Sequence, residues 1–236
     1  MKAGIVGLPN VGKSTLFNCL SNAKAQSANF PFCTIEPNIG VVNVPDPRIA
    51  TLEGLVNPER VVPATVEIVD IAGLVKGASK GEGLGNQFLG NIRETDAILH
   101  VLRCFDNDNI THVDGSVNPL RDKEIIDIEL QLKDLESINN RLDKVNRTAK
   151  SGDKDAIQEK HILEKAVNLL ESSNNIRSIE IDNEEKIKYL KPLQLITDKP
   201  VLYVCNVDEG SVSTTNDYVE SVRSLIAKED ADLIIL

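Results

Sequence analysis

The N-terminus contains the feature that most constrains the fold of this chain. Residues 3–6 form a short apolar run, and residues 7–14, whose letters are GLPNVGKS, match the pattern G-x-x-x-x-G-K-S. Gly7 and Gly12 can adopt backbone angles that a Cβ forbids, so that successive N–H groups converge on one phosphate. The pattern therefore predicts a strand, a phosphate-binding loop and a helix. The expected nucleotide contacts are Asn10, Val11, Gly12, Lys13, Ser14 and Thr15.

Two further segments complete a predicted magnesium and γ-phosphate site. Residues 65–69 are typical of a β-strand, and Asp70 follows them as the start of Asp-x-x-Gly73. Asp70 suits a ligand of Mg²⁺ or of its water, and the Gly73 N–H can sense the γ-phosphate. Thr34 can present its hydroxyl to Mg²⁺ in a switch segment, or it can be an ordinary loop threonine. The predicted metal residues are thus Ser14, Thr34 and Asp70.

A third segment bears on the choice of base. Residues 200–205 are typical of a buried parallel strand and lead to Asn206-Val207-Asp208-Glu209. Guanine-selective switch proteins have N-K-x-D here, with the aspartate accepting two hydrogen bonds from guanine. The longer Glu209 spoils that paired contact, and Val207 removes the lysine stem that packs over the base. Asn206 can serve adenine N6 or N7, so we expect ATP to be preferred to GTP.

Together these motifs resemble the Obg-related translation-factor NTPases, and within them the YchF subfamily. The resemblance covers the glycine-rich residues 70–85 and also residues 29–38, 91–95, 103–113 and 206–209. It implies an ATP-preferring member of a GTPase-like superfamily, with a coiled-coil insertion and contact with the ribosome or translation machinery. Members also carry a further part of the nucleotide domain and a C-terminal TGS domain. We expect both to be absent from a chain that stops at Leu236.

The residue that would position the attacking water is not the usual one. Many switch GTPases have glutamine directly after Asp-x-x-Gly, where this chain has Leu74, which makes no hydrogen bond. His112 follows a buried strand and a polar loop, and a neutral imidazole can orient water or accept its proton. The resemblance implies that His112 is the catalytic group; the alternative is a surface-loop histidine. The predicted catalytic set is His112, Lys13 and Gly73.

Asn10 raises the question of a second ion. Its carboxamide oxygen can coordinate K⁺ between the α- and γ-phosphates, where negative charge develops during hydrolysis. Alternatively, its side chain only stiffens the phosphate loop through hydrogen bonds. The sequence leaves both interpretations open.

Residues 122–196 differ in character from their surroundings and are rich in charge. An apolar heptad seam is predicted at Ile125, Ile128, Leu132, Leu135 and Leu142. Asp153 can cap a second helix, with an apolar stripe at Ile157, Leu163, Val167 and Leu170. We expect an antiparallel helical coiled-coil hairpin that docks a partner.

The expected architecture is a three-layer α/β P-loop domain with a mostly parallel sheet, built from residues 1–121 and 197–236 and interrupted by the hairpin of residues 122–196. The net charge of −10 argues against a broad electrostatic grip on nucleic acid, including strong DNA binding. No apolar run is long enough for a membrane span, and the four cysteines are scattered, which favours a cytoplasmic enzyme.

The predicted function is slow, Mg²⁺-dependent hydrolysis of ATP by a conformational switch. The alternatives are a GTP-driven switch and a non-catalytic scaffold that acts through its helical arm. The sequence leaves the oligomeric state open.

Overall fold

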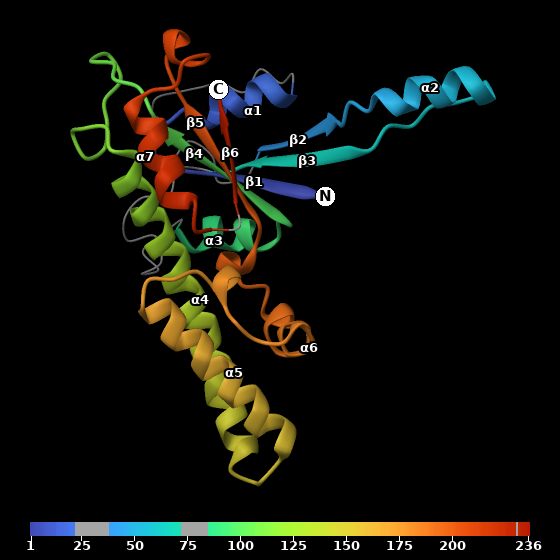
Figure 1. Ribbon diagram of the computed structural model, residues 1–236. Helices are drawn as coiled ribbons and strands as arrows, with labels where there is room; N and C mark the ends of the chain where they lie inside the picture. Colours follow the sequence, from blue (N-terminus) through green and yellow to red (C-terminus); the bar gives the residue numbers. More distant parts are fainter. Residues whose placement is uncertain (22–37, 72–84, 230) are drawn as a thin grey trace.

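The protein is built on one six-stranded sheet, seen in the computed structural model, which describes residues 1–21, 38–71, 85–229 and 231–236 (Figure 1). The strand order is β2-β3-β1-β4-β5-β6. Among the strands of the described residues, only β2 runs antiparallel to its neighbour, β3. The strands are β1 (Lys2–Val6), β2 (Asn38–Asn43), β3 (Thr65–Asp70), β4 (Ala97–Arg103), β5 (Val201–Asn206) and β6 (Asp232–Ile235). The predicted mostly parallel sheet is confirmed.

The register of the parallel strands brings the sequence motifs to one edge. Ile5 of β1 lies opposite Asp70 of β3, and Arg103 at the end of β4 lies opposite Asn206 at the end of β5. The carboxyl ends of these strands therefore share an edge, because the strands run parallel to one another. That edge is the place where open α/β sheets bind ligands.

Helices pack on both faces of the sheet, which gives the predicted three layers. Figure 1 shows α1 (Lys13–Ser21) and α3 (Gly85–Arg93) on opposite sides of the strands. Phe17 of α1, Leu89 of α3 and Val222 of α7 (Asp217–Ile226) are buried in the same apolar core as Ile5. The core side chains of the strands alternate between the two faces, so both helical layers are needed to cover them.

A long extension leaves the sheet between β2 and β3 (Figure 1). It carries α2 (Pro47–Val56), which begins with Asp46 as N-cap, its Oδ1 accepting from the Arg48 N–H at 3.0 Å. Asn57 ends the helix in the left-handed conformation, with φ 45°. No residue of α2 is buried. Local capping, rather than packing, therefore defines this helix.

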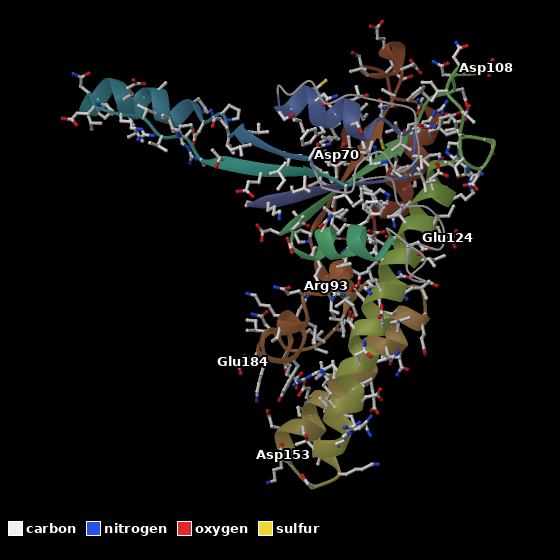
Figure 2. All side chains as sticks on the ribbon, turned by 180° about the vertical axis from the view of Figure 1, so that it is seen from behind. Asp70, Arg93, Asp108, Glu124, Asp153 and Glu184 are labelled. Atoms are coloured by element: carbon white, nitrogen blue, oxygen red, sulfur yellow. The ribbon has the colours of Figure 1, made fainter. Side chains whose placement is uncertain are left out.

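The helical arm is formed by α4 (Pro119–Ala149) and α5 (Lys154–Glu171), which pack as an antiparallel hairpin (Figure 1). Asp153 caps α5 as predicted, because its Oδ1 accepts from the Ala156 N–H at 2.8 Å. Short turns then cover the side of the hairpin: η2 (Ile176–Ser178), α6 (Asn183–Glu185), the π-helix η3 (Lys186–Leu190), η4 (Lys191–Leu193) and η5 (Ile196–Asp198). They contribute Ile176, Tyr189 and Leu190 to a second apolar core. Figure 2 shows Asp153 at the tip of the arm, far from Asp70 in the sheet.

The predicted apolar stripes of the arm are wrong in part. On α4, Ile128 and Leu132 are 41% and 40% exposed, whereas Ile126 and Leu130 are buried in the sheet core. Ile138 and Val145 are then buried in the arm core. The buried face follows a straight helix past two different cores, and it includes acidic residues that a search for apolar repeats passes over. On α5, Leu163 and Leu170 are buried as predicted, but Ile157 is 49% exposed.

The described residues show the state of three cysteines and the length and polarity of the helices. Cys19, Cys104 and Cys205 are free thiols there, and Cys33 lies outside the described ranges. Within those ranges, every helix is too short or too polar to span a bilayer.

Candidate nucleotide-binding site

The phosphate loop between β1 and α1 requires glycine at both predicted positions. Gly7 has φ 150°, and a Cβ there would lie 2.5 Å from the Val101 carbonyl oxygen. Gly12 has φ 102°, and a Cβ there would lie 2.5 Å from Asn206 Nδ2. Both the backbone angle and the lack of space exclude other residues. The loop is therefore held against β4 and β5 in the conformation that its sequence predicts.

Lys13 opens α1 and lies inside the loop. Its Nζ donates to the Leu8 carbonyl oxygen at 2.7 Å, and the side chain is almost fully buried. Burial lowers the pKa of Lys13 to about 8, although nearby Asp70 acts in the opposite direction. A buried ammonium that has one carbonyl partner among the described residues is a strong anion receptor, since a phosphate would replace lost solvation.

Asp70 and Ser14 face each other beside this lysine. The Ser14 hydroxyl is hydrogen-bonded to the Asp70 carboxylate, while burial raises the pKa of Asp70. Asp70 Oδ1 is buried without a hydrogen-bond partner among the described residues. A hydroxyl and an unsatisfied carboxylate oxygen are the ligand types that Mg²⁺ takes, so the pair fits this ion. The other predicted members, Thr34 and Gly73, lie outside the described residues.

The segment predicted to contact the base divides into inward and outward residues. Asn206 Nδ2 donates to the Val11 carbonyl oxygen at 3.0 Å, so this carboxamide braces the phosphate loop. Val207 is only 8% exposed, which leaves little of it for a base to contact. Glu209 is exposed at the start of η6 (Glu209–Ser211), which Asp208 caps through the Ser211 N–H at 3.0 Å. In this segment, Glu209 is thus the carboxylate that is available to contact a base.

Asn10 and Thr15 lie on the outer side of the loop. Asn10 is exposed, with φ 63°, and its Nδ2 donates to the Thr111 carbonyl oxygen at 3.2 Å. Thr15 is exposed in the first turn of α1. The Asn10 contact joins the phosphate loop to the segment that carries His112.

Arg103 shapes the loop that leads to His112, a role that the sequence motifs did not predict. This side chain is 1% exposed, and its guanidinium donates to the carbonyl oxygens of Phe105 (3.1 Å), Asn107 (3.1 Å) and Ile110 (2.9 Å). It also stacks on the Phe105 ring at 4.8 Å. A buried arginine can be satisfied only by such a set of acceptors, so the loop closes around it. An arginine at the end of an apolar strand was the signal in the sequence.

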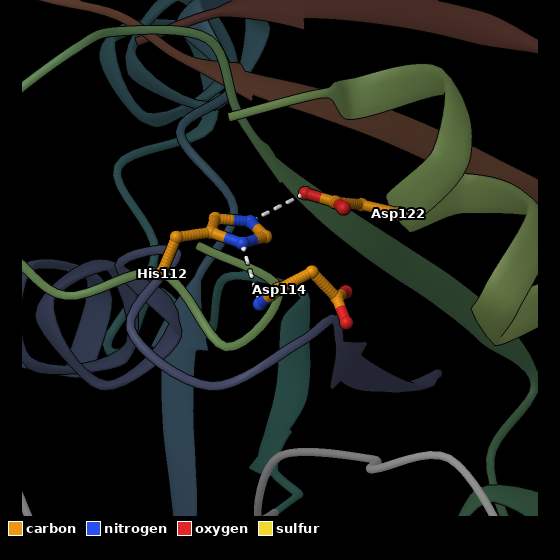
Figure 3. A group of neighbouring side chains, drawn as sticks. All are labelled: His112, Asp114 and Asp122. Atoms are coloured by element: carbon orange, nitrogen blue, oxygen red, sulfur yellow. Dashed lines mark hydrogen bonds and ion pairs between the residues drawn. The ribbon is translucent and has the colours of Figure 1, made fainter. Parts of the chain in front are cut away.

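His112 is buried rather than exposed on the loop surface. Its Nε2 lies 2.8 Å from Asp122 Oδ2, and its Nδ1 accepts from the Asp114 backbone N–H at 3.1 Å (Figure 3). An accepting Nδ1 places the ring hydrogen on Nε2, so Asp122 is the acceptor. Asp122 lies in the first turn of α4 and is 1% exposed. Sequence reasoning found the histidine but not its carboxylate partner.

The fold and this edge define a P-loop nucleoside-triphosphate-binding class of protein. The family described as "50S ribosome-binding GTPase" matches residues 2–141, more than half of the sequence, and the chain belongs to this family.

Several curated proteins are similar to this chain over nearly its whole length. The "Ribosome-binding ATPase YchF" of Escherichia coli O157:H7 is 54% identical over 233 residues, which cover 99% of this chain and 64% of that protein. The protein of the same name from Bacillus subtilis is 53% identical over 238 residues, covering 100% of this chain and 65% of its own length. The resemblance to the YchF subfamily is thereby confirmed. The chain spans slightly less than two thirds of the length of these relatives.

Among solved structures, the Schizosaccharomyces pombe YchF GTPase superposes with a TM-score of 0.81 at 38% identity. The match covers 100% of this chain and 65% of that one. The α/β domain and its helical arm are therefore features shared with that structure.

Proposed function

We propose that the chain binds ATP with Mg²⁺ and hydrolyses it slowly as a conformational switch. The observation that carries this proposal is the site formed by Lys13, Ser14 and Asp70 beneath a loop that only glycine allows. The curated relatives, which are named ATPases, support the choice of activity. We further propose the domain division predicted from the sequence, with residues 1–121 and 197–236 binding the nucleotide and residues 122–196 forming the arm.

In this proposal the site residues have different roles in hydrolysis. The loop amides and Lys13 bind the phosphates, and Lys13 exchanges the Leu8 carbonyl for a phosphate oxygen. Their positive charge stabilises the negative charge that develops on the leaving phosphate. The Gly73 N–H senses the γ-phosphate, and His112 orients the attacking water.

Ser14, Thr34 and Asp70 hold the metal ion in this proposal. Mg²⁺ supplies positive charge to the β- and γ-phosphate oxygens when it is bound.

Asn10 is proposed to offer its Oδ1 to K⁺, since its Nδ2 is already bonded to Thr111. We expect a faster ATPase rate in KCl than in NaCl of equal ionic strength, and an Asn10→Ala variant that no longer distinguishes the two salts. Equal rates in both salts for the unaltered chain would exclude the K⁺ role.

The base preference is tested at Glu209, because this carboxylate is exposed and its replacement leaves the core untouched. We expect Glu209→Asp to narrow the preference for ATP over GTP about tenfold or more, since the shorter carboxylate restores a paired contact with guanine. Competition of ATP and GTP against a fluorescent nucleotide measures both affinities.

Glu220→Asp is the matched control, because Glu220 is exposed on α7, away from the segments proposed to contact the nucleotide. GTP bound more tightly than ATP by the unaltered chain would favour the GTP-driven switch. Val207→Lys is a poor test, because it places a charge at a buried position.

We propose the ribosome as the partner of the arm, since the curated relatives are named ribosome-binding. Residues 139–150, the end of α4 and its C-cap, carry Arg141, Lys144, Arg147 and Lys150 against one acidic residue, Asp143, all exposed. Arg141 is paired with Glu159 of α5 at 2.6 Å, which leaves Lys144, Arg147 and Lys150 as the positive charges of this segment. This local excess of positive charge suits ribosomal RNA even though the chain as a whole is acidic.

The partner proposal is tested by charge reversal at the arm's distal end. We expect the double variant Arg147→Glu, Lys150→Glu to co-sediment with ribosomes at least about tenfold more weakly, because two phosphate contacts are lost. Its ATPase rate without ribosomes should stay unchanged. Lys228→Glu, an exposed lysine beyond α7, is the control. Undiminished sedimentation of the double variant would exclude this face of the arm.

A further inference from the structure

The contacts of Asp122 with His112 and Arg121 connect the proposed catalytic histidine to the first turn of the arm helix. Asp122 Oδ2 accepts the His112 Nε2–H at 2.8 Å, and Oδ1 accepts from the guanidinium of Arg121 at 3.0 Å. Arg121 in turn donates to the Ser116 carbonyl oxygen at 2.6 Å. Both oxygens of a carboxylate that is 1% exposed are therefore occupied, and its orientation is determined on both sides.

The other ring nitrogen of His112 is held much less firmly. Its partner is the backbone N–H of Asp114, at 3.1 Å, in a turn that Gly115 closes by donating its N–H to the His112 carbonyl oxygen. Gly115 has φ 75°, and a Cβ there would meet nothing within 4 Å. The turn is thus open to solvent, whereas Asp122 is packed at the base of a 31-residue helix.

We propose that Asp122 is a positioning residue for His112, holding the ring hydrogen on Nε2 so that Nδ1 is the lone pair offered to the attacking water. This inference rests on the proposed function of His112. Rearrangement of the turn at 113–115 releases Nδ1 from the Asp114 amide, while the bond to Asp122 keeps the ring in one orientation. Nδ1 then accepts a hydrogen bond from the water as its oxygen bonds to the γ-phosphorus. The bond from that phosphorus to the β–γ bridging oxygen breaks at the same time, so that ADP leaves with its electron pair and the water's proton passes to the released phosphate.

Two features of the structure support this direction of action. The Asn10–Thr111 contact, at 3.2 Å, keeps the residue before His112 against the phosphate loop. A histidine that must accept from water needs its hydrogen on the opposite nitrogen, and a carboxylate at that nitrogen fixes the tautomer. Asp122 satisfies this requirement from the first turn of α4.

The test compares Asp122→Asn with His112→Ala and with Asp143→Asn, a matched control at an exposed position on the same helix. We expect Asp122→Asn to lower kcat for ATP on the order of 10²-fold, with an unchanged Kd for ATP, because the amide no longer selects one tautomer. Asp143→Asn should leave both unchanged. Because a folding defect would also lower kcat, an Arg121→Ala variant, which keeps the His112 contact, should lose less activity than Asp122→Asn.

A spectroscopic measurement separates positioning from general structural support. In ¹⁵N-histidine-labelled chain, the His112 signals, assigned by their loss in His112→Ala, should show hydrogen on Nε2. In Asp122→Asn with Mg²⁺ and a non-hydrolysable ATP analogue bound, the state in which we propose that Nδ1 is released from the Asp114 amide, they should shift toward hydrogen on Nδ1.

The possible results separate this proposal from the proposed function. Unchanged kcat and tautomer in Asp122→Asn, with an inactive His112→Ala, would overturn only the positioning role. A raised kcat in Asp122→Asn would show instead that Asp122 locks His112 in an inactive position. Full activity in His112→Ala would overturn the role of the histidine, and with it the role of Asp122.

Discussion

At the scale of single residues, Lys13 is a side chain whose acidity is changed strongly by its surroundings. Burial lowers its pKa to about 8 in the ligand-free protein. A bound triphosphate favours the ammonium form, so the pKa must rise on binding. ATP affinity should therefore be constant below about pH 8 and fall above it, by up to about tenfold per pH unit.

Titration calorimetry between pH 7 and pH 10 checks this expectation. Proton uptake on binding should appear near pH 9, as a dependence of the measured heat on the ionisation enthalpy of the buffer. Lys13→Arg is the control, because arginine stays charged over this range and its binding should show no such decline. Affinity of the unaltered chain that is constant up to pH 10 would show that Lys13 titrates elsewhere.

At the scale of elements, the joint between α4 and the turn before β5 depends on Asp134. This fully buried carboxylate accepts from the backbone N–H groups of Ile196 (2.9 Å) and Thr197 (2.7 Å), and from the Thr197 hydroxyl (2.7 Å). Asp134→Asn turns one acceptor into a donor that faces other donors. We expect a loss of about 2–3 kcal/mol in the free energy of unfolding.

Urea denaturation measures the effect of Asp134→Asn. Glu136→Gln, at an exposed position two residues further along α4, should change the free energy of unfolding by less than about 0.5 kcal/mol. If the two variants were equally stable, the Asp134 contacts would not hold the arm to the domain.

At the scale of the whole molecule, a charged cluster joins the base of the arm to the chain beyond α7. Glu229 contacts Lys123 Nζ at 2.8 Å, the Tyr203 hydroxyl at 2.8 Å and Arg177 at 3.4 Å. Burial by itself would lower the pKa of Lys123, but Asp127 and Glu229 raise it above its ordinary value. Lys123 therefore stays charged, and its buried ammonium is stabilised by these acidic partners.

Removing the Glu229 carboxylate should lower the stability of the folded protein. We expect Glu229→Gln to lower the thermal midpoint and to cost about 1–3 kcal/mol of unfolding free energy, since Arg177 and Lys123 keep their charges but lose an acceptor. Calorimetry should show one transition at lower temperature. A transition that splits in two would mean that this cluster is what makes the domain and the arm unfold together.

The sequence was most informative where local backbone chemistry decides the structure. The phosphate loop, Asp70 at the end of β3, the cap at Asp153 and the mostly parallel sheet follow from short patterns of glycine, apolar and capping residues. The arm was predicted as a hairpin, but its buried face was not, because Ile126 and Leu130 contact the sheet core whereas Ile138 contacts α5 and the turns after it. A heptad count along one helix contains no information about which distant segment covers it.

The sequence by itself determined that this chain has a glycine-dependent phosphate loop at the edge of a parallel sheet, because backbone angles and strand periodicity are properties of neighbouring residues. The tertiary structure alone decided that Arg103 organises the loop before His112 and that Asn206 braces the phosphate loop. It also decided that Asp122 accepts a hydrogen bond from the Nε2–H of His112. Those contacts depend on the packing of α4, β4 and β5 in three dimensions, and buried polar groups there must find partners wherever the fold places them.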